Sequence, residues 1–370
     1  MKYGRLMAMM MSAVLLALSL AGCHTTDPAA DAEQQDSQQV EETEAIQFIY
    51  PDETITELED GLSMVAFHGN DGFENFLTQG GASDDSGVIQ FLVDNLGDDL
   101  LGLLFGGNPF GCSTLKADGE NGEILFGRNF DWNTCDALIV QSTPESGYAS
   151  ISTVNRDFID QSGVPVGRLP DNIQALVSLY APLDGMNEAG LAVSVNMIQD
   201  EAIIDQNTDK PDLTTTTAIR LLLNQAANVD EALNLLEQYD MHSSMGMMIH
   251  FAIADSTGRS VVVEYVNNEM VVTETPVVTN FYLAEGEKYG IGTEQSHTRY
   301  EILTDLLSRQ STFTMEDMRD AMSSVSKQNF GEFESTEWSI VFDLTNGIAQ
   351  YYHRENYDVS YSFEIGGADA

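Results

Sequence analysis

A glycine–cysteine junction near residue 111 carries the residues best suited to chemistry. The stretch Gly111-Cys112-Ser113-Thr114 precedes a second run that contains Arg128 and Asp131. If the bond between Gly111 and Cys112 is cut, Cys112 becomes a first residue that carries both a thiol and a free α-amino group. A thiol titrates near about 8.5 and an α-amino group near about 7.7 to 8.0, so the amine can serve as the base for the sulfur. The pattern predicts nucleophilic attack on an amide without a separate histidine.

Two charged residues downstream fit this chemistry. A cation such as Arg128 favours the thiolate, and a carboxylate such as Asp131 orients the new amine and adjusts its pKa. The chain has only one other cysteine beyond the first residues, Cys135, which we interpret as a small packing residue. A disulfide between Cys112 and Cys135 would silence the nucleophile, so we expect none.

The composition disfavours several other classes of protein. Acidic residues number 59 against 15 basic ones, for a formal net charge of −44, which disfavours binding to nucleic acid or to an anionic membrane surface. No phosphate-binding or dinucleotide-binding glycine motif occurs, so we expect no cofactor. We also expect no metal site, because the histidines lack ligand spacing; they are His24, His68, His242, His250, His297 and His353.

The first residues predict export. Lys2 and Arg5 precede an apolar segment that ends in Leu20-Ala21-Gly22-Cys23. This resembles a bacterial lipoprotein signal, which implies removal of residues 1–22 and a lipid on Cys23 that anchors the protein at the cell envelope. Residues 23–46 are polar and acidic and predict a flexible tether.

Residues 47–111 predict a packed, mostly helical prosegment. Apolar residues recur at helical spacing from Phe73 to Leu103, and a loop of glycine and proline follows at residues 106–111. After Cys112 the pattern alternates between strands and paired helices. It predicts strands at 123–130, 137–141, 149–154, 174–179, 191–197 and 247–280, helices at 214–227, 229–239, 296–309 and 315–326, and a closing hairpin at Asn346-Gly347 before a last strand at 358–365.

Several motifs in order resemble the choloylglycine hydrolase and penicillin V acylase family of N-terminal-nucleophile amidases. They are Cys112-Ser113-Thr114, Gly127-Arg128-Asn129-Phe130-Asp131-Trp132, Asn187-Glu188-Ala189-Gly190-Leu191-Ala192-Val193 with Asn196, Thr279-Asn280, Ser296-His297-Thr298-Arg299 and Thr336-Glu337-Trp338-Ser339-Ile340-Val341. The resemblance covers residues 111–370. It implies an α+β fold, a four-layer αββα sandwich, with residues 112–370 as the amidase domain.

The resemblance also implies the roles of individual residues. Cys112 would be the nucleophile, Arg128 would support its thiolate, and Asp131 would hold the α-amino group. Asn196 would supply the oxyanion-hole side chain, with Asn280 and Arg299 as the remaining site residues. Plain structural roles compete: Asn196 could end a strand, Asn280 could cap a turn, and Arg299 could be a charge on a helix surface.

Two departures from the family pattern bear on function. The long prosegment resembles the acid ceramidase side of the superfamily, in which autoproteolysis leaves the prosegment as a smaller subunit. Asn280 and Arg299 also lie closer together than in bile-salt hydrolases, which disfavours bile-salt specificity.

The sequence thus predicts a self-activating cysteine amidohydrolase. Its partner would be a small N-acyl amide: an acylated amino acid or amino alcohol, a bile-acid conjugate, an acyl homoserine lactone or a penicillin. The anionic surface favours neutral substrates. Two alternatives stay open: acyl transfer to an amine at the same site, and a lipid-anchored binding protein without activity.

Overall fold

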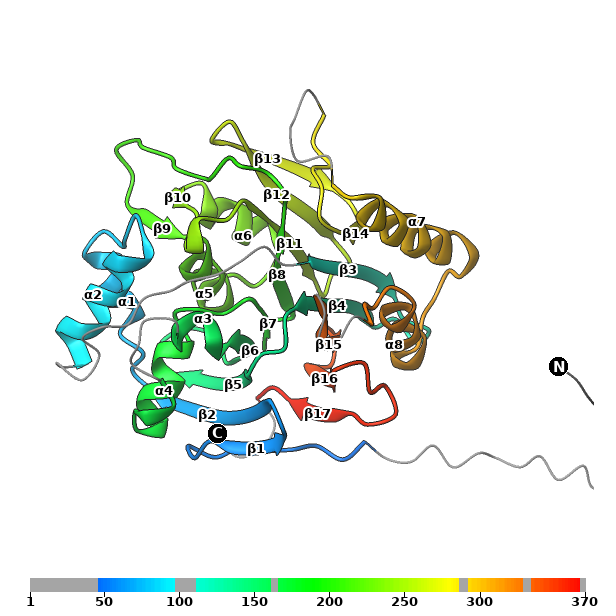
Figure 1. The fold of residues 1–370 in the computed structure, drawn as a ribbon, viewed down its shortest axis with the longest axis horizontal. Helices are drawn as coiled ribbons and strands as arrows, with labels where there is room; N and C mark the ends of the chain where they lie inside the picture. Colours follow the sequence, from blue (N-terminus) through cyan, green and yellow to red (C-terminus); the bar gives the residue numbers. More distant parts are fainter. Residues whose placement is uncertain (1–45, 97–110, 161–165, 286–291, 329–333, 367–370) are drawn as a thin grey trace, which may run out of the picture. The chain divides into compact units, whose positions relative to one another are not determined.

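The computed structural model describes residues 46–96, 111–160, 166–285, 292–328 and 334–366 (Figure 1). The expected signal peptide, the lipidated Cys23 and nearly all of the tether lie outside the described residues. Leu100 and Leu103 of the expected prosegment helices lie outside them too, as does the loop at residues 106–110.

Two large sheets dominate the fold (Figure 1). The larger has nine strands, in the order β1 (Thr56–Glu59), β2 (Leu62–Gly69), β5 (Ala137–Pro144), β6 (Ser150–Asn155), β7 (Asp184–Asn187), β8 (Leu191–Met197), β11 (Ile249–Asp255), β12 (Ser260–Val266) and β13 (Glu269–Glu274). The smaller has six, in the order β14 (Val277–Val278), β3 (Gly111–Asp118), β4 (Ile124–Trp132), β15 (Ser335–Asp343), β16 (Ile348–His353) and β17 (Tyr361–Glu364).

Helices pack against both sheets. On the nine-stranded sheet, α5 (Thr215–Gln225) contacts β7 and β8, and α6 (Val229–Leu236) contacts β11. On the six-stranded sheet, α7 (Glu294–Arg309) contacts β3 and β14, and α8 (Met315–Ser324) contacts β3, β4 and β15. Strand β3 also contacts β8 across the two sheets. This arrangement confirms the predicted α+β class.

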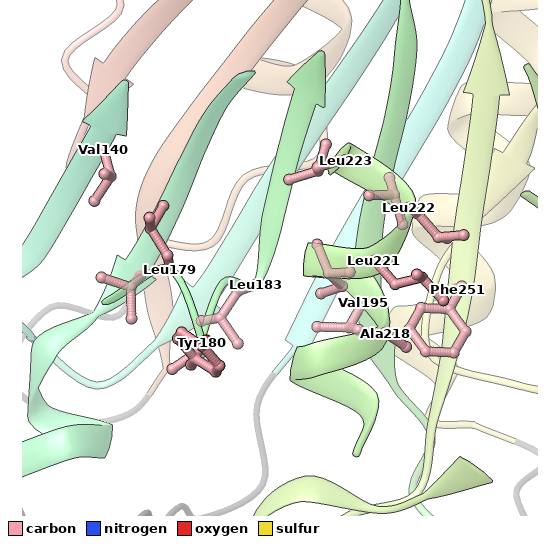
Figure 2. Packing of buried hydrophobic residues seen from close by; sticks show 14 of the residues in the cluster. Val140, Leu179, Tyr180, Leu183, Val195, Ala218, Leu221, Leu222, Leu223 and Phe251 are labelled. Atoms are coloured by element: carbon pink, nitrogen blue, oxygen red, sulfur yellow. The ribbon is translucent and has the colours of Figure 1, made fainter. Parts of the chain in front are cut away.

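Apolar packing explains why α5 lies where it does. Its residues Leu221, Leu222 and Leu223 are fully buried, and Figure 2 shows Leu221 and Leu222 on the side of the helix that faces Val195 of β8 and Phe251 of β11. The helix begins at a capping box, in which the Thr214 side chain accepts from the Thr217 N–H and the Thr217 hydroxyl accepts from the Thr214 N–H. The second apolar cluster lies between α7, α8 and the six-stranded sheet.

The remaining elements are α1 (Phe73–Thr78), α2 (Asp85–Leu96), α3 (Arg156–Asp160), α4 (Asp171–Ser178), the 3-10 turns Val166–Arg168 and Ser244–Gly246, and a small parallel pair of strands, β9 (Asp212–Thr214) and β10 (Asp240–His242). None of the helices in the described part of the chain has the length and apolar character needed to cross a membrane.

The strand predicted at residues 174–179 is wrong, because this segment forms helix α4. Pro170 is the N-cap and Asp171 lies in the first turn, where a negative charge is favourable. The helix buries Ala175, Leu176 and Val177 in succession. A continuous apolar run of this length does not distinguish a buried strand from a buried helix, which is why the pattern misled.

Residues 47–111, the predicted prosegment, contain the helices α1 and α2 and also two strands that were not predicted from the sequence. Strand β2 pairs in parallel with β5 from Leu62↔Ala137 to Gly69↔Pro144, and β1 forms the edge of the sheet. The rings of Phe73, Phe76 and Phe91 pack around Tyr180 at centroid distances of 5.7, 5.8 and 5.9 Å. The prosegment is therefore part of the main core.

A buried ion pair also joins the prosegment to α5. The Arg220 guanidinium donates to Asp71 Oδ2 at 3.0 Å, and Asn224 Nδ2 donates to the same oxygen at 3.3 Å. Both charges are nearly excluded from water, with side-chain exposures of 1% and 9%. Removal of one partner would leave the other charge buried and uncompensated.

We predict that Arg220→Met lowers the free energy of unfolding by about 3–5 kcal/mol, because Asp71 loses its buried counter-charge. Chemical denaturation monitored by circular dichroism measures the change. The matched control is Arg309→Met, which breaks an exposed i,i+4 pair with Asp305 and should cost under about 0.5 kcal/mol. Equal small losses in both variants would contradict the importance of the buried pair.

Candidate active site

Cys112 lies at the start of β3, on the face buried between the two sheets. It pairs with Phe130 of β4, and its side chain is fully buried. Burial raises the pKa of the Cys112 thiol; Arg128, which hydrogen-bonds the sulfur, lowers that pKa, and the Asp131 carboxylate raises it. The thiolate therefore depends on the two guanidinium groups beside it, those of Arg128 and Arg299.

Arg128 is held in place by backbone oxygens and one carboxylate. Its Nη1 and Nη2 donate to the carbonyls of Asn129 at 2.7 Å and Val195 at 2.9 Å, and its Nε donates to Asp184 Oδ2 at 3.3 Å. Trp338 Nε1 donates to the same carboxylate oxygen at 3.0 Å. Burial raises the pKa of Asp184, and Arg128 opposes this. Asp184 thus fixes the orientation of Arg128 toward the sulfur.

Arg299 connects Cys112 to two other site residues. Its Nη1 donates to the Cys112 carbonyl at 2.8 Å and to Asp131 Oδ2 at 3.2 Å, and its Nη2 donates to Asn280 Oδ1 at 2.7 Å. The Cys112 N–H donates to the same Asn280 oxygen at 2.9 Å. The backbone nitrogen that would become the α-amino group therefore lies inside this network.

Two hydrogen bonds, one from its side chain and one from its backbone N–H, orient Asn280. Its Nδ2 donates to the Met197 carbonyl at 2.8 Å, and its N–H donates to Ser296 Oγ at 2.8 Å. Ser296 and Arg299 lie one turn apart on the same face of α7, which explains how one helix reaches Asn280 twice. His250 Nε2 donates to the carbonyl of Thr279, the preceding residue, at 2.8 Å.

Asn196 lies on β8, across the sheet sandwich from β3. Its Oδ1 accepts from Arg128 Nη1 at 3.4 Å, and its Nδ2 donates to the Val278 carbonyl at 3.4 Å. Both hydrogen bonds are long, so they hold the Asn196 amide group only weakly. A side-chain amide beside a buried cysteine can donate to an oxygen that gains negative charge.

All six residues proposed from the sequence come together in the structure: Cys112, Arg128, Asp131, Asn196, Asn280 and Arg299 are buried and linked by the contacts above. The catalytic role of each stays a prediction. Cys135 lies apart; burial raises its pKa well above the ordinary value, and both described cysteines are free thiols. Within the described ranges, no cluster of His, Cys, Asp or Glu could hold a metal ion.

Sequence reasoning missed four supporting residues. Thr336 Oγ1 donates to Asp131 Oδ1 at 2.7 Å, Lys327 Nζ lies 3.6 Å from Asp131 Oδ2, Asp184 holds Arg128, and His250 supports Thr279. Thr336 lies in one of the motifs already identified, and Asp184 lies three residues before another, which begins at Asn187. The one feature of the sequence that singles out Lys327 is its positive charge, since the strongly acidic chain has only 15 basic residues.

We predict that Arg128→Met shifts the titration of the Cys112 thiol to higher pH, because the cation that favours the thiolate is lost. The ultraviolet absorbance of the thiolate reports this in a chain without residues 1–23 and with Cys135 replaced by alanine. The control variant, Arg309→Met, changes an exposed arginine and should leave the titration unchanged. An unchanged titration in Arg128→Met would mean that Arg128 does not act on the sulfur.

Comparisons with known proteins bear on this geometry. Residues 176–358 match the family model described as acyl-coenzyme A:6-aminopenicillanic acid acyl-transferase. No curated protein matches the chain. Penicillin V acylase from Agrobacterium tumefaciens is 19% identical over 65% of this chain and 83% of that one, with a TM-score of 0.46.

Two solved structures of conjugated bile acid hydrolase from Clostridium perfringens share the fold. One, with a cysteine replaced by alanine, is 17% identical, covers 70% of this chain and 93% of that chain, and has a TM-score of 0.53. The other, with an arginine replaced by leucine, is 16% identical and has a TM-score of 0.52. It covers 68% of this chain and 92% of that chain. The family match over residues 176–358 and the shared fold agree with the resemblance to the choloylglycine hydrolase and penicillin acylase family.

Proposed function

We propose that this chain is a cysteine amidohydrolase that activates itself by cutting the bond between Gly111 and Cys112 and then hydrolyses a linear N-acyl amide. The observation that carries the proposal is the position of the Cys112 backbone nitrogen. It donates to Asn280 Oδ1 inside the buried network that also holds Asp131 and Arg299. A cut at this bond would release an amine beside its own thiol, in a site already built to orient it.

Maturation begins at the thiol. The Cys112 sulfur attacks the Gly111 carbonyl carbon, the carbon–nitrogen bond breaks, and the nitrogen takes up a proton to give an amine and a thioester. Water then hydrolyses the thioester, which leaves a carboxylate on Gly111 and restores the thiol. The new α-amino group lies where Asn280 and Asp131 can hold it.

Substrate turnover repeats this chemistry on an external amide. The α-amino group takes the thiol proton while the sulfur attacks the substrate carbonyl, and Asn196 with a backbone N–H donates to the developing oxyanion. The leaving amine takes a proton as the thioester forms. Water, activated by the same α-amino group, completes the hydrolysis. Arg128, fixed by Asp184, favours the thiolate throughout.

Neutral N-acyl amides are the substrate class that we favour, because the −44 net charge of the chain repels anionic ligands. One of the structural relatives is named a hydrolase of conjugated bile acids and another an acylase of penicillin V. Both names describe the removal of an acyl group from nitrogen, which is the reaction proposed here.

Acyl transfer to an amine is the second candidate. The matching family model favours it, because that model describes an acyl-transferase. The two reactions share the thioester and differ in whether water or an amine enters. Product analysis with an added amine separates them: transfer gives a new N-acyl product at the expense of the free acid, and hydrolysis gives the free acid alone.

The prosegment would stay bound after the cut. Strand β2 lies between β1 and β5 in the nine-stranded sheet, and Asp71 is paired with Arg220. Arg354 of the catalytic part also donates to the Asp60 carbonyl in the β1–β2 turn at 3.0 Å. We propose that the prosegment remains as a small subunit and, through a lipid on Cys23, holds the enzyme at the cell envelope.

We predict that the chain produced without residues 1–23 yields a fragment that begins at Cys112, and that Cys112→Ala yields none. Intact mass and N-terminal sequencing of the fragments measure this. Cys135→Ala is the matched control, since Cys135 is also buried but lies outside the network, and it should be cut as the wild type is. An uncut wild type without amidase activity would instead favour a binding protein that keeps the fold.

We also predict that the two fragments elute together in size-exclusion chromatography after the cut and separate only when the protein is denatured. The reason is that separation would expose the aromatic cluster around Tyr180 and leave Arg220 unpaired. A catalytic fragment that elutes alone under native conditions would contradict a retained subunit.

A further inference from the structure

Lys327 is a buried lysine for which the six-residue site gives no role. Lysine side chains are seldom buried unless they are paired, because removal of an ammonium group from water is costly. The Lys327 side chain is only 6% exposed, and its Nζ lies 2.5 Å from Glu334 Oε2 and 3.6 Å from Asp131 Oδ2. The ammonium therefore interacts with two carboxylates, that of Glu334 and that of Asp131, and Asp131 belongs to the proposed site.

The backbone of Lys327 is fixed by the residue that also supports Asp131. The Lys327 N–H donates to Thr336 Oγ1 at 2.8 Å, and the Thr336 N–H donates to the Lys327 carbonyl at 3.0 Å. The Thr336 hydroxyl in turn donates to Asp131 Oδ1. Thr336 therefore holds Lys327 and Asp131 in a defined relation to each other.

The Lys327 ammonium occupies the space beside the Gly111 α-carbon. A Cβ at residue 111 would overlap Lys327 Nζ and would lie 3.1 Å from Asp131 Oδ2 and 3.2 Å from Glu334 Oε2. The backbone at Gly111 does not have a positive φ, so its conformation does not require glycine. The close contacts at Gly111 come from the charged side-chain ends packed against it.

We propose that Lys327, oriented by Glu334 and Thr336, is a positioning residue for the cut between Gly111 and Cys112. The ammonium packs against the residue that carries the scissile carbonyl, so it fixes the acyl side of the bond relative to the thiol. This inference rests on the proposed self-cleavage.

The charges created by the cut give Lys327 a second effect. Hydrolysis of the bond consumes one water and leaves a carboxylate on Gly111 and, after proton uptake, an ammonium on Cys112. Asp131 is available to the new ammonium, whereas the new carboxylate forms beside Asp131 and Glu334. Lys327 is the cation among these groups that lies next to Gly111, so it offsets the repulsion on that side.

The test compares rates of self-cleavage, followed by intact mass, in the otherwise complete chain without residues 1–23. Lys327→Met should slow the cut about 10- to 100-fold, the range expected when the geometry of a reacting bond is disturbed. Lys327→Arg should recover much of the rate because it restores the charge. Lys210→Met, which alters an exposed lysine, should match the wild type.

A double variant separates positioning from charge pairing within the fold. Lys327→Met with Glu334→Gln removes both charges of the pair. We expect its thermal stability to recover relative to Lys327→Met while the cut stays slow. Cleavage at the wild-type rate in Lys327→Met or in the double variant would show that Lys327 serves only as a partner for Glu334, and would overturn the inference.

Gly111→Ala provides a test that leaves every charge in place, and it decides the question if Lys327→Met fails to fold. We expect a slow cut in Gly111→Ala, because the new methyl group overlaps the Lys327 ammonium and displaces it from the residue that carries the scissile carbonyl. Normal cleavage of Gly111→Ala would contradict the proposed packing. A wild type that never cuts itself would instead refute the proposed function.

Discussion

The fold around Cys112 is constrained by buried charge. Arg128, Arg299, Asp131 and Asp184 are all nearly excluded from water, and each would be unstable there without its partner. The partners come from β4, β7 and α7, which are far apart in the sequence, so both sheets and a helix of the outer layer must meet at one point. In the same arrangement, the guanidinium groups of Arg128 and Arg299 both lower the pKa of the Cys112 thiol, against the effect of burial.

The prosegment belongs to this architecture and does not merely cover it. Its strand β2 extends the nine-stranded sheet next to β5, and its Asp71 satisfies the only charged group of α5, Arg220. Parallel pairing between β2 and β5 needs a long connection, which the chain from α1 to β4 provides. A cut before Cys112 would therefore divide the chain in sequence without dividing its core.

Much of the site could be predicted from the sequence, because the motifs place chemically distinctive residues at fixed spacing. Cys112, Arg128 and Asp131 lie on the adjacent strands β3 and β4, and Ser296 and Arg299 share one face of α7. The supporting residues could not be predicted. Hydrogen bonds to Thr336 place Lys327 beside Gly111, and His250 of β11 reaches Thr279, which follows β14 of the other sheet. Such contacts depend on register and packing that no local pattern contains.

The same limit applies to the fold. Amphipathic helices such as α6 and α8 show clear periodicity and were predicted, whereas α4 buries consecutive residues from Gln174 to Ser178 and looks like a strand in sequence. Strands β1 and β2 were not predicted from the sequence. What places β2 in the sheet is its pairing with β5, a non-local interaction.

The central claim is that Cys112 is the nucleophile and forms a thioester with Gly111 on the way to the mature enzyme. Addition of hydroxylamine to the freshly purified, uncut chain tests this most directly, because hydroxylamine attacks thioesters far faster than amides. The account predicts faster cleavage and an N-terminal fragment that ends in a Gly111 hydroxamate, as measured by mass spectrometry. An unchanged rate and a fragment that ends only in a free carboxylate would contradict a thioester at Cys112.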